Sequence, residues 1–353
     1  MISTESRAFF ASMVETASPS GYEQAIQGLV REWSEVFADE VRSDVHGSLI
    51  ATRNANGSPR ILLDGHCDQI GLMVQHIDKE GFLYFQPIGG WDTAILLGQA
   101  VSVQTKAGPL AGVIGRKPLH LLDEADREKV PKLRDLWIDI GVDGREEAEE
   151  TVRIGDAVTL RPGLQELPHD RMSGPKMDNS AGLFVVFETL KRLQERSFEA
   201  ALFVVSAVQE EVGLRGARTA AFGVDPDVGI AVDVTHATDC PTIDQREHGD
   251  IKLGHGPVLF RGPNINPVLY ESLCRLAAAN NLSIQHKGAN RGTANDANVL
   301  QLTRAGVATA AVGIPNRYMH TPVEMISMQD LDTAAELLTR FVIEAQPDTS
   351  FVP

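Results

Sequence analysis

Four apolar segments constrain the fold of this chain most strongly, because polar residues scarcely interrupt them. They cover residues 60–65, 200–207, 228–234 and 307–314. Apolar residues recur at helical spacing in other segments, at 179–193, 268–280 and 329–345. Continuous apolar strands that alternate with helices form mostly parallel sheets that are buried on both faces. The pattern therefore predicts an α/β domain with a mixed, mostly parallel sheet and helices on both faces.

Residues 71–163 follow a different sequence pattern from the rest of the chain. Short β-like runs, punctuated by Gly and Pro, lie at 72–77, 82–86, 101–105, 110–114, 136–140 and 157–160. This spacing predicts a small all-β barrel or sandwich, and we favour the barrel. Because a single core stops growing at about 250–300 residues, a chain of 353 residues fits two domains. We therefore expect an α/β domain of residues 1–70 and 164–353, with a barrel of residues 71–163 inserted into it.

The charge and the cysteines argue against several classes of protein. Acidic residues outnumber basic ones by 48 to 32, and the formal charge of −16 argues against nucleic-acid binding. No apolar run reaches the roughly 18–20 residues that span a membrane, and the first residues lack the layout of a signal peptide. The few scattered cysteines suit reduced thiols rather than a disulfide framework. We therefore expect a cytoplasmic protein.

Imidazole and carboxylate side chains recur where the apolar segments end or where a helix begins. Open α/β sheets place their functional sites outside the carboxyl ends of the strands. Residues far apart in the sequence can therefore converge on one rim of the sheet. The candidates are His66 and Asp68 after the first segment, Glu210 and Glu211 after the second, Asp233 in the third, His320 after the last, and Asp178 before a helix.

These residue types predict a site for two divalent metal ions. Imidazole and carboxylate together suit zinc, cobalt or manganese better than calcium or magnesium. Two histidines and several carboxylates are too many for one tetrahedral zinc ion, but they suffice for two ions that share a carboxylate. Such a pair, about 3.5–4 Å apart, can hold a hydroxide and polarise a carbonyl group. Neighbouring residues of an extended chain point in opposite directions, so one of Glu210 and Glu211 can bind metal while the other acts as a general base.

Each of these features has a simpler structural explanation when it stands alone. Two adjacent glutamates are typical of a solvated strand end, and Asp178 before Asn179 is typical of a helix N-cap. Cys67 lies between two candidate residues, but the sequence pairs no base with it, so a structural role is favoured over a nucleophile. The conjunction of candidates at successive strand ends is what favours the metal site.

The segments around the candidates also resemble a known family. They are Gly65-His66-Cys67-Asp68-Gln69-Ile70-Gly71, Lys176-Met177-Asp178-Asn179, Gln209-Glu210-Glu211-Val212-Gly213, Val232-Asp233-Val234-Thr235-His236-Ala237 and Arg317-Tyr318-Met319-His320-Thr321-Pro322. Two segments of the predicted barrel share the resemblance, Lys117-Pro118-Leu119-His120-Leu121-Leu122 and Leu136-Trp137-Ile138-Asp139-Ile140-Gly141. In this order, and over nearly the whole chain, the sequence is similar to the glutamyl-aminopeptidase family of dinuclear metallopeptidases, which includes the tetrahedral (TET) aminopeptidases.

The resemblance implies an aminopeptidase, which releases N-terminal residues from peptides through a water that two metal ions and a general base activate. The ions would be zinc or cobalt, or else manganese. The barrel would mediate dimerisation, and the dimers would build a hollow dodecamer that admits only unfolded peptides. The implied roles place His66 and Asp233 on one ion, Glu211 and His320 on the other, Asp178 between them, Glu210 as the general base and Asp68 as the group that orients His66.

A few positions depart from the family's pattern. Gln69 stands where many relatives have Glu, Ser180 stands where many have Arg, and residues 292–297 resemble a longer version of a Gly-Thr-Asp-Ala loop. None of these departures removes a candidate ligand or the base. The pocket for the N-terminal side chain is expected to form from loops such as 254–266 and 287–297, and the sequence does not give its preference.

Other functions remain open on the same scaffold. A carboxypeptidase, a deacylase or a deacetylase could use the same pair of metal ions. An endoglucanase fits poorly, because glycosidases normally use two carboxylates without metal. A non-catalytic assembly protein fits poorly as well, because Glu210 provides a competent base.

Overall fold

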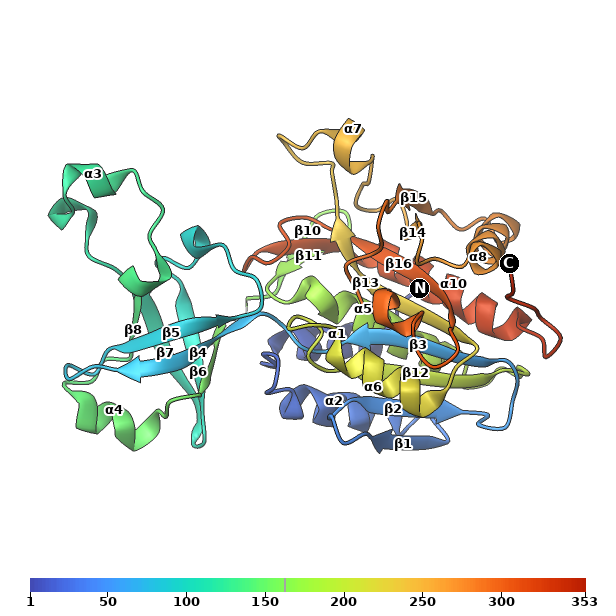
Figure 1. Ribbon diagram of the computed structural model, residues 1–353, viewed down its shortest axis with the longest axis horizontal. Coiled ribbons are helices and arrows are strands. Elements are labelled where there is room, and N and C mark those ends of the chain that lie inside the picture. Colours follow the sequence, from blue (N-terminus) through green and yellow to red (C-terminus); the bar gives the residue numbers. More distant parts are fainter. Residues whose placement is uncertain (162) are drawn as a thin grey trace.

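The computed structural model describes residues 1–161 and 163–353. It contains an α/β domain and a β-barrel that lies to one side of that domain (Figure 1). The fold class predicted from the sequence is confirmed, because the α/β domain has a mixed sheet with helices on both faces and the barrel is closed and antiparallel. No helix in the described part of the chain is long and apolar enough to cross a membrane.

The α/β domain is built on an eight-stranded sheet. Its four central strands run parallel, and the strands that flank them, β2 and β14, run antiparallel to their inner neighbours. The order across the sheet is β1 (Glu40–Ser43), β2 (Leu49–Arg53), β12 (Ala201–Ala207), β3 (Arg60–His66), β13 (Val228–His236), β16 (Ala308–Asn316), β14 (Val258–Arg261) and β15 (Gln285–Gly288). A separate antiparallel sheet contains β10 (Gln165–Leu167), β11 (Arg171–Gly174) and β17 (Glu324–Ser327).

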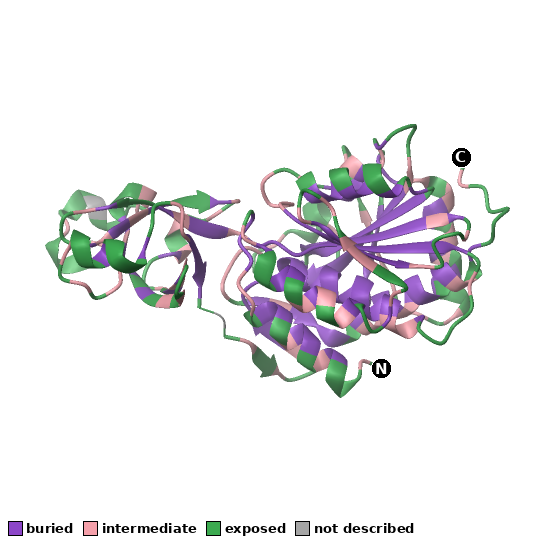
Figure 2. Cartoon of the chain, turned by 90° about the horizontal axis from the view of Figure 1, so that it is seen from below, coloured by how far each residue is buried: buried purple, intermediate pink, exposed green. Residues whose placement is uncertain are grey.

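Helices enclose the eight-stranded sheet, so its central strands are almost entirely buried (Figure 2). One face is covered by α5 (Met177–Arg192), with α1 (Thr4–Glu15), α8 (Pro267–Ala279) and α10 (Met328–Glu344). The opposite face is covered by α6 (Arg215–Val224) and α9 (Ala297–Leu300). Two further helices are α2 (Gln24–Ser34), which packs on α1 and β2, and α7 (Gln245–His248).

Two glycines let α5 lie unusually close to the sheet. A Cβ atom on Gly182 would lie 2.1 Å from the carbonyl oxygen of Val232 on β13. A Cβ atom on Gly65 of β3 would lie 2.8 Å from the backbone nitrogen of Leu183. Because real Cβ atoms cannot approach this closely, glycine is required at both contacts. The close packing brings the first residues of α5 to the carboxyl ends of β3 and β13.

The other face of these strands carries the polar side chains. Gly229 of β13 faces α9, since a Cβ atom there would lie 3.3 Å from Cδ1 of Leu300. Side chains alternate along a strand, so Asp233 and Thr235 share the face of Gly229. Asp64 is aligned with Ala231 on this face, and His66 follows two residues later on β3. The carboxyl ends of β3 and β13 therefore present polar groups on the side away from α5.

The barrel has its own hydrophobic core, separate from that of the α/β domain. Branched side chains such as Val74, Val101 and Ile138 fill it. Around the barrel, the strands are β4 (Gly71–Ile77), β5 (Leu83–Ile88), β8 (Trp137–Asp139), β7 (Gly108–Gly115), β6 (Ala100–Thr105) and β9 (Ala157–Leu160). The connections contain α3 (Glu124–Arg127), α4 (Arg145–Thr151) and the 3-10 turns Thr93–Ile95, Leu119–Leu121 and Leu133–Asp135.

Candidate metal centre

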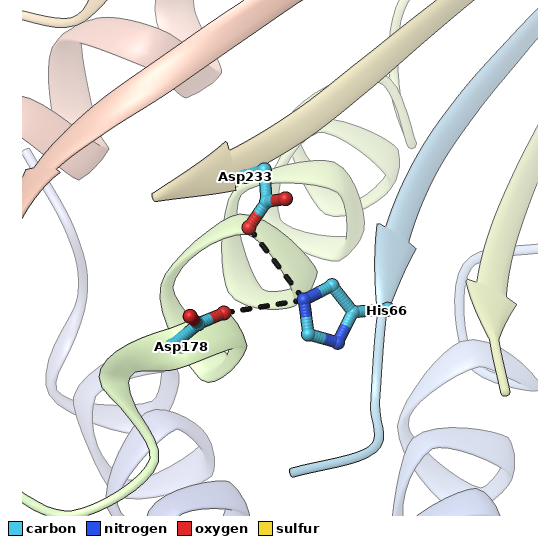
Figure 3. Close-up of side chains that lie close together, drawn as sticks. All are labelled: His66, Asp178 and Asp233. Atoms are coloured by element: carbon cyan, nitrogen blue, oxygen red, sulfur yellow. Dashed lines mark ion pairs between the residues drawn. The ribbon is translucent and has the colours of Figure 1, made fainter. Parts of the chain in front are cut away.

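A first group of possible metal ligands lies at the ends of β3 and β13. Nε2 of His66 lies 3.2 Å from Oδ1 of Asp178 and 3.5 Å from Oδ1 of Asp233. Figure 3 shows both carboxylates directed at the same imidazole nitrogen, one from the start of α5 and the other from the end of β13. All three side chains are buried, and their ligand atoms lie within 4.8 Å of one another.

A second group uses the other oxygen of the same aspartate. Nε2 of His320 lies 3.2 Å from Oδ2 of Asp178 and 3.6 Å from Oε2 of Glu211. These atoms also lie within 4.8 Å of one another. Asp178 therefore directs one carboxylate oxygen towards each histidine. This is the arrangement that a carboxylate shared between two ions requires.

The backbone around Asp178 is fixed by buried polar contacts. The side chain of Asn179 donates a hydrogen bond to the carbonyl oxygen of Val232 at 2.9 Å and accepts one from the backbone N–H of Gly182 at 2.8 Å. The peptide bond between Asp178 and Asn179 is cis. These contacts tie the start of α5 to the end of β13 and so hold Asp178 opposite Asp233.

Glu324, on β17, is a buried residue of the site that the sequence reasoning missed. Its carboxylate accepts hydrogen bonds from the backbone N–H of Asp178 at 3.0 Å and from that of His320 at 2.7 Å. One side chain thus holds the backbone of two candidate ligands from different parts of the chain. Nδ1 of His320 lies 3.1 Å from the carbonyl oxygen of Gly90, which follows β5 of the barrel. The barrel therefore contacts the site directly.

Asp68 contacts residues of both groups. Its carboxylate lies 3.4 Å from Nδ1 of His66 and accepts hydrogen bonds from the backbone N–H groups of Glu210 at 2.9 Å and Glu211 at 3.1 Å. Ser20 donates a further hydrogen bond at 2.6 Å. Burial alone would raise the pKa of Asp68, but the bonds to His66 and Ser20 outweigh it and hold the pKa below its ordinary value. Asp68 is therefore a buried anion that positions three of the candidates.

Glu210 adjoins the first group without belonging to it. Oε2 of Glu210 lies 3.9 Å from Nε2 of His66. Burial, together with the nearby charges of Asp233, Asp296 and Asp178, raises the pKa of Glu210 to about 10. Its carboxyl group can therefore hold a proton close to the candidate ligands.

The structure thus brings together all seven residues that the sequence singled out. It adds a buried carboxyl pair that the sequence reasoning did not assign, Asp64 on β3 and Asp296 before α9. Burial raises the pKa of Asp64 to about 7, and burial with the charge of Asp64 raises that of Asp296 well above its ordinary value. Asp64 lies inside an apolar strand, and a mid-strand aspartate is the signal that could have marked it. Cys67 is buried, and burial raises the pKa of its thiol, which fits the structural role favoured for it.

Fold and site together have the architecture of a metal-dependent peptidase: an α/β domain with two histidine–carboxylate groups around a shared aspartate at its strand ends. The chain belongs to the M42 glutamyl aminopeptidase family, whose model matches residues 47–337. The sequence-based resemblance to this family is confirmed. The members of the family are aminopeptidases, so the protein is a hydrolase.

Relatives match over almost the entire chain. A lysyl aminopeptidase from Pyrococcus furiosus is 39% identical over 340 residues, which cover 95% of this chain and 96% of the relative. The crystal structure of a TET aminopeptidase from the marine sediment archaeon Thaumarchaeota archaeon SCGC AB-539-E09 matches with a TM-score of 0.93 and 35% identity, and covers 97% of both chains. The TET1 peptidase of Pyrococcus horikoshii, described as assembling into a tetrahedron or a large octahedral shell, matches with a TM-score of 0.87 and 31% identity, over 96% of this chain and all of that one.

Proposed function

We propose that this protein releases N-terminal residues from peptides with the help of two divalent metal ions held at the rim of its sheet. One observation carries the proposal. The two carboxylate oxygens of Asp178 face two different histidines, and each histidine has a further carboxylate beside it. A pair of ions that share a carboxylate needs this arrangement, and a single ion does not.

The residues fit such ions in kind and in position. His66 and Asp233 would hold one ion, Glu211 and His320 the other, and Asp178 would bridge them. Oε1 of Glu211 is buried and has no hydrogen-bond partner among the described residues, which suits an oxygen that faces a cation. Mixed imidazole and carboxylate ligands favour zinc or cobalt, and also permit manganese.

Glu210 is the proposed general base. Two bound ions would polarise the scissile carbonyl and lower the pKa of a water molecule between them. Glu210 would take the proton from that water and later return it to the leaving amine, a role in which side chains commonly contribute about 10²–10⁴-fold in rate. Asp68 would hold the imidazole of His66 in position and the backbone of Glu210 beside it, as its hydrogen bonds favour.

The free amine of the substrate would be recognised by charge. The chain has a formal charge of −16, and two of the carboxylic acids at the site, Glu210 and Asp68, are not assigned to either ion. An ammonium group is attracted to such a site, whereas an acetylated amine is uncharged and is not attracted. We therefore favour the aminopeptidase over a deacylase, a deacetylase or a carboxypeptidase.

We also propose that the barrel, assigned to residues 71–163, carries the dimer interface, and that residues 1–70 and 164–353 form the catalytic domain. Large apolar side chains are exposed on the barrel, with 49% of Leu119, 64% of Leu121 and 63% of Val130 accessible. Exposed apolar side chains gathered on one domain are typical of a surface that binds another protein. We further infer that such dimers assemble into a hollow dodecamer that admits unfolded peptides. The dodecamer and the shells described for the TET1 peptidase of Pyrococcus horikoshii support a large assembly of this kind.

The test is hydrolysis of short peptides with free or N-acetylated ends. The protein is first stripped of metal with a chelator, and zinc, cobalt or manganese is then added back. We expect release of single N-terminal residues, only with metal and only from free peptides. Cleavage confined to the acetylated set would favour a deacylase on the same site, and full activity of the stripped protein would contradict the two-metal proposal.

A further inference from the structure

Glu23 is a buried carboxyl group that contacts the segment of the proposed base. It is the residue before α2, and only 4% of it is exposed. Its Oε1 atom accepts hydrogen bonds from the backbone N–H groups of Gly21 at 2.7 Å and of Gln209 at 3.2 Å. Gln209 directly precedes Glu210 in the sequence. One oxygen of Glu23 therefore joins the turn before α2 to the residue before the proposed base.

The backbone conformation of Gln209 depends on its surroundings. This residue has a φ of 57°, which lies in the left-handed region that residues other than glycine rarely adopt. Such a conformation is costly for a residue with a side chain, and it persists where surrounding contacts impose it. Gln209 lies in the segment between β12 and α6. Its conformation therefore decides the course of the chain at Glu210.

Two buried acidic side chains hold the backbone of this segment. Glu23 accepts the hydrogen bond from the N–H group of Gln209 at 3.2 Å. Asp68 accepts those of the next two residues, Glu210 at 2.9 Å and Glu211 at 3.1 Å. Three consecutive N–H groups are thus held by side chains from two different parts of the chain. Glu23 completes a set of contacts that Asp68 alone leaves open at its first position.

Glu23 and Asp68 differ in what else they contact. The carboxylate of Asp68 also lies 3.4 Å from Nδ1 of His66, so a substitution there would disturb a candidate metal ligand directly. Within the described part of the chain, Glu23 forms no hydrogen bond with a candidate metal ligand. Loss of Glu23 should therefore disturb the base while Asp68 still holds the ligands in place.

We propose that Glu23 is a positioning residue, which fixes the backbone turn at Gln209 and thereby directs the carboxylate of Glu210 at the water that it deprotonates. The inference rests on the proposed function, because Glu23 has this role only in the step that Glu210 performs. A general base works within hydrogen-bond reach of the proton that it takes. A displacement of about 1 Å, caused from outside the reacting groups, can lower the rate by about 10²-fold.

This role requires a hydrogen-bond acceptor at position 23 and does not require a negative charge. Burial raises the pKa of Glu23 above its ordinary value, and the charge of nearby Asp68 adds to the increase. The amide oxygen of a glutamine can accept the same two hydrogen bonds as the carboxyl oxygen. Glutamine should therefore replace Glu23, whereas alanine or leucine should not.

The test compares the wild type with Glu23→Ala and Glu23→Gln, all full-length and metal-loaded, on the free peptide that the wild type hydrolyses fastest. We expect Glu23→Ala to lower kcat by about 10–100-fold, with KM within about threefold of the wild-type value and two ions still bound per chain. Glu23→Gln should keep kcat within about threefold of the wild type. Gln24→Ala is the matched control, because the side chain of this neighbour is exposed, and it should leave kcat unchanged.

A double-mutant cycle separates a positioning role from a general structural one. If Glu23 acts through Glu210, its loss should matter only while the base is present. We expect Glu23→Ala to lower kcat by less than about threefold when Glu210→Gln is already in place. An equal loss in both backgrounds, or a loss of bound metal that parallels the loss of activity, would overturn the inference. If Glu23→Ala folds poorly, Glu23→Leu makes the same comparison with the space filled.

Failure of this inference can be told apart from failure of the proposed function. If the wild type releases N-terminal residues and Glu210→Gln does not, while Glu23→Ala is as active as the wild type, the inference is wrong and the proposed function stands. If the wild type releases no N-terminal residue with any metal, the proposed function fails, and the inference fails with it.

Discussion

The two groups that share Asp178 differ in burial and in the elements that build them. His66 is 1% exposed and belongs to the central strands, as does Asp233. His320 is 35% exposed, lies in the segment between β16 and β17, and contacts Gly90 beside the barrel. We call the set of His66, Asp178 and Asp233 the buried group, and the set of His320, Asp178 and Glu211 the open group. The buried group is built mainly on the sheet, whereas the open group depends on a connecting segment and on the inserted barrel. We expect an ion in the open group to exchange faster and to be the one that substrate meets first.

Asp178 is the residue on which both groups depend, so its loss should have the largest effect. In Asp178→Ala, neither group keeps a complete set of ligands, and we expect the metal content to fall at both positions. Turnover should fall by at least about 10³-fold. The measurements are metal analysis after dialysis and peptide hydrolysis, with the exposed Asp348→Ala as the control. A variant that keeps two ions per chain would contradict the bridging role.

A substitution at Glu210 should lower the rate of hydrolysis without changing the metal content. Glu210→Gln keeps the shape of the side chain but removes the base, so kcat should fall by about 10²–10⁴-fold while both ions stay bound. Glu211→Gln is the matched variant, since it changes the neighbouring residue in the same way, and it should weaken the ion of the open group instead. Near-normal turnover in Glu210→Gln would show that another group takes the proton.

Substitutions of the two histidines test whether the two groups differ in how tightly they hold their ions. His320→Ala should leave about one ion per chain, held by the buried group, whereas His66→Ala should lose the buried ion and also lower the melting temperature. Metal content against chelator concentration, measured for both variants and for the wild type, gives the order of loss. If His320→Ala empties both positions at the same chelator concentration, the two groups bind as one unit and the comparison fails.

The sequence predicted the parts of this molecule that depend on repeating apolar patterns. The six β-like runs of residues 71–163 correspond to the strands of the barrel, and the continuous apolar segments form the centre of the sheet. The strands β14 and β15, which lie at one side of the eight-stranded sheet, and the small sheet of β10, β11 and β17 were not predicted. These strands have only three or four residues each, which is too short to show the apolar alternation that identifies a strand, and β10 and β15 are also largely exposed.

The candidate ligands could be proposed from sequence because strands of a parallel sheet end at one rim. The structure brings these residues together, and their roles stay predictions. Glu324 was missed because its function depends on two backbone N–H groups that only the folded chain places beside it. Contacts between distant backbone and side-chain atoms carry no sequence pattern of their own.

The pH dependence of folding stability should differ between the metal-free and the metal-loaded protein. This is the smallest of the predicted effects. The hydrogen bond to Asp178 raises the pKa of His320 to about 9, and burial raises that of Glu211 to about 9. Both groups therefore hold protons in the folded chain at pH values where the unfolded chain has released them. Because the folded state binds more protons, its stability falls as the pH rises from about 5 to about 9.

We expect the melting temperature of the chelator-treated protein to drop by roughly 5 °C or more between pH 6 and pH 9. In the metal-loaded protein the ligands are already deprotonated by the ions, so the same change of pH should have less effect. Differential scanning calorimetry of both forms across this range makes the comparison. A metal-free protein that grows more stable towards pH 9 would contradict the raised pKa values of His320 and Glu211. The close contacts between His320 and its carboxylates would then not hold protons in the folded chain.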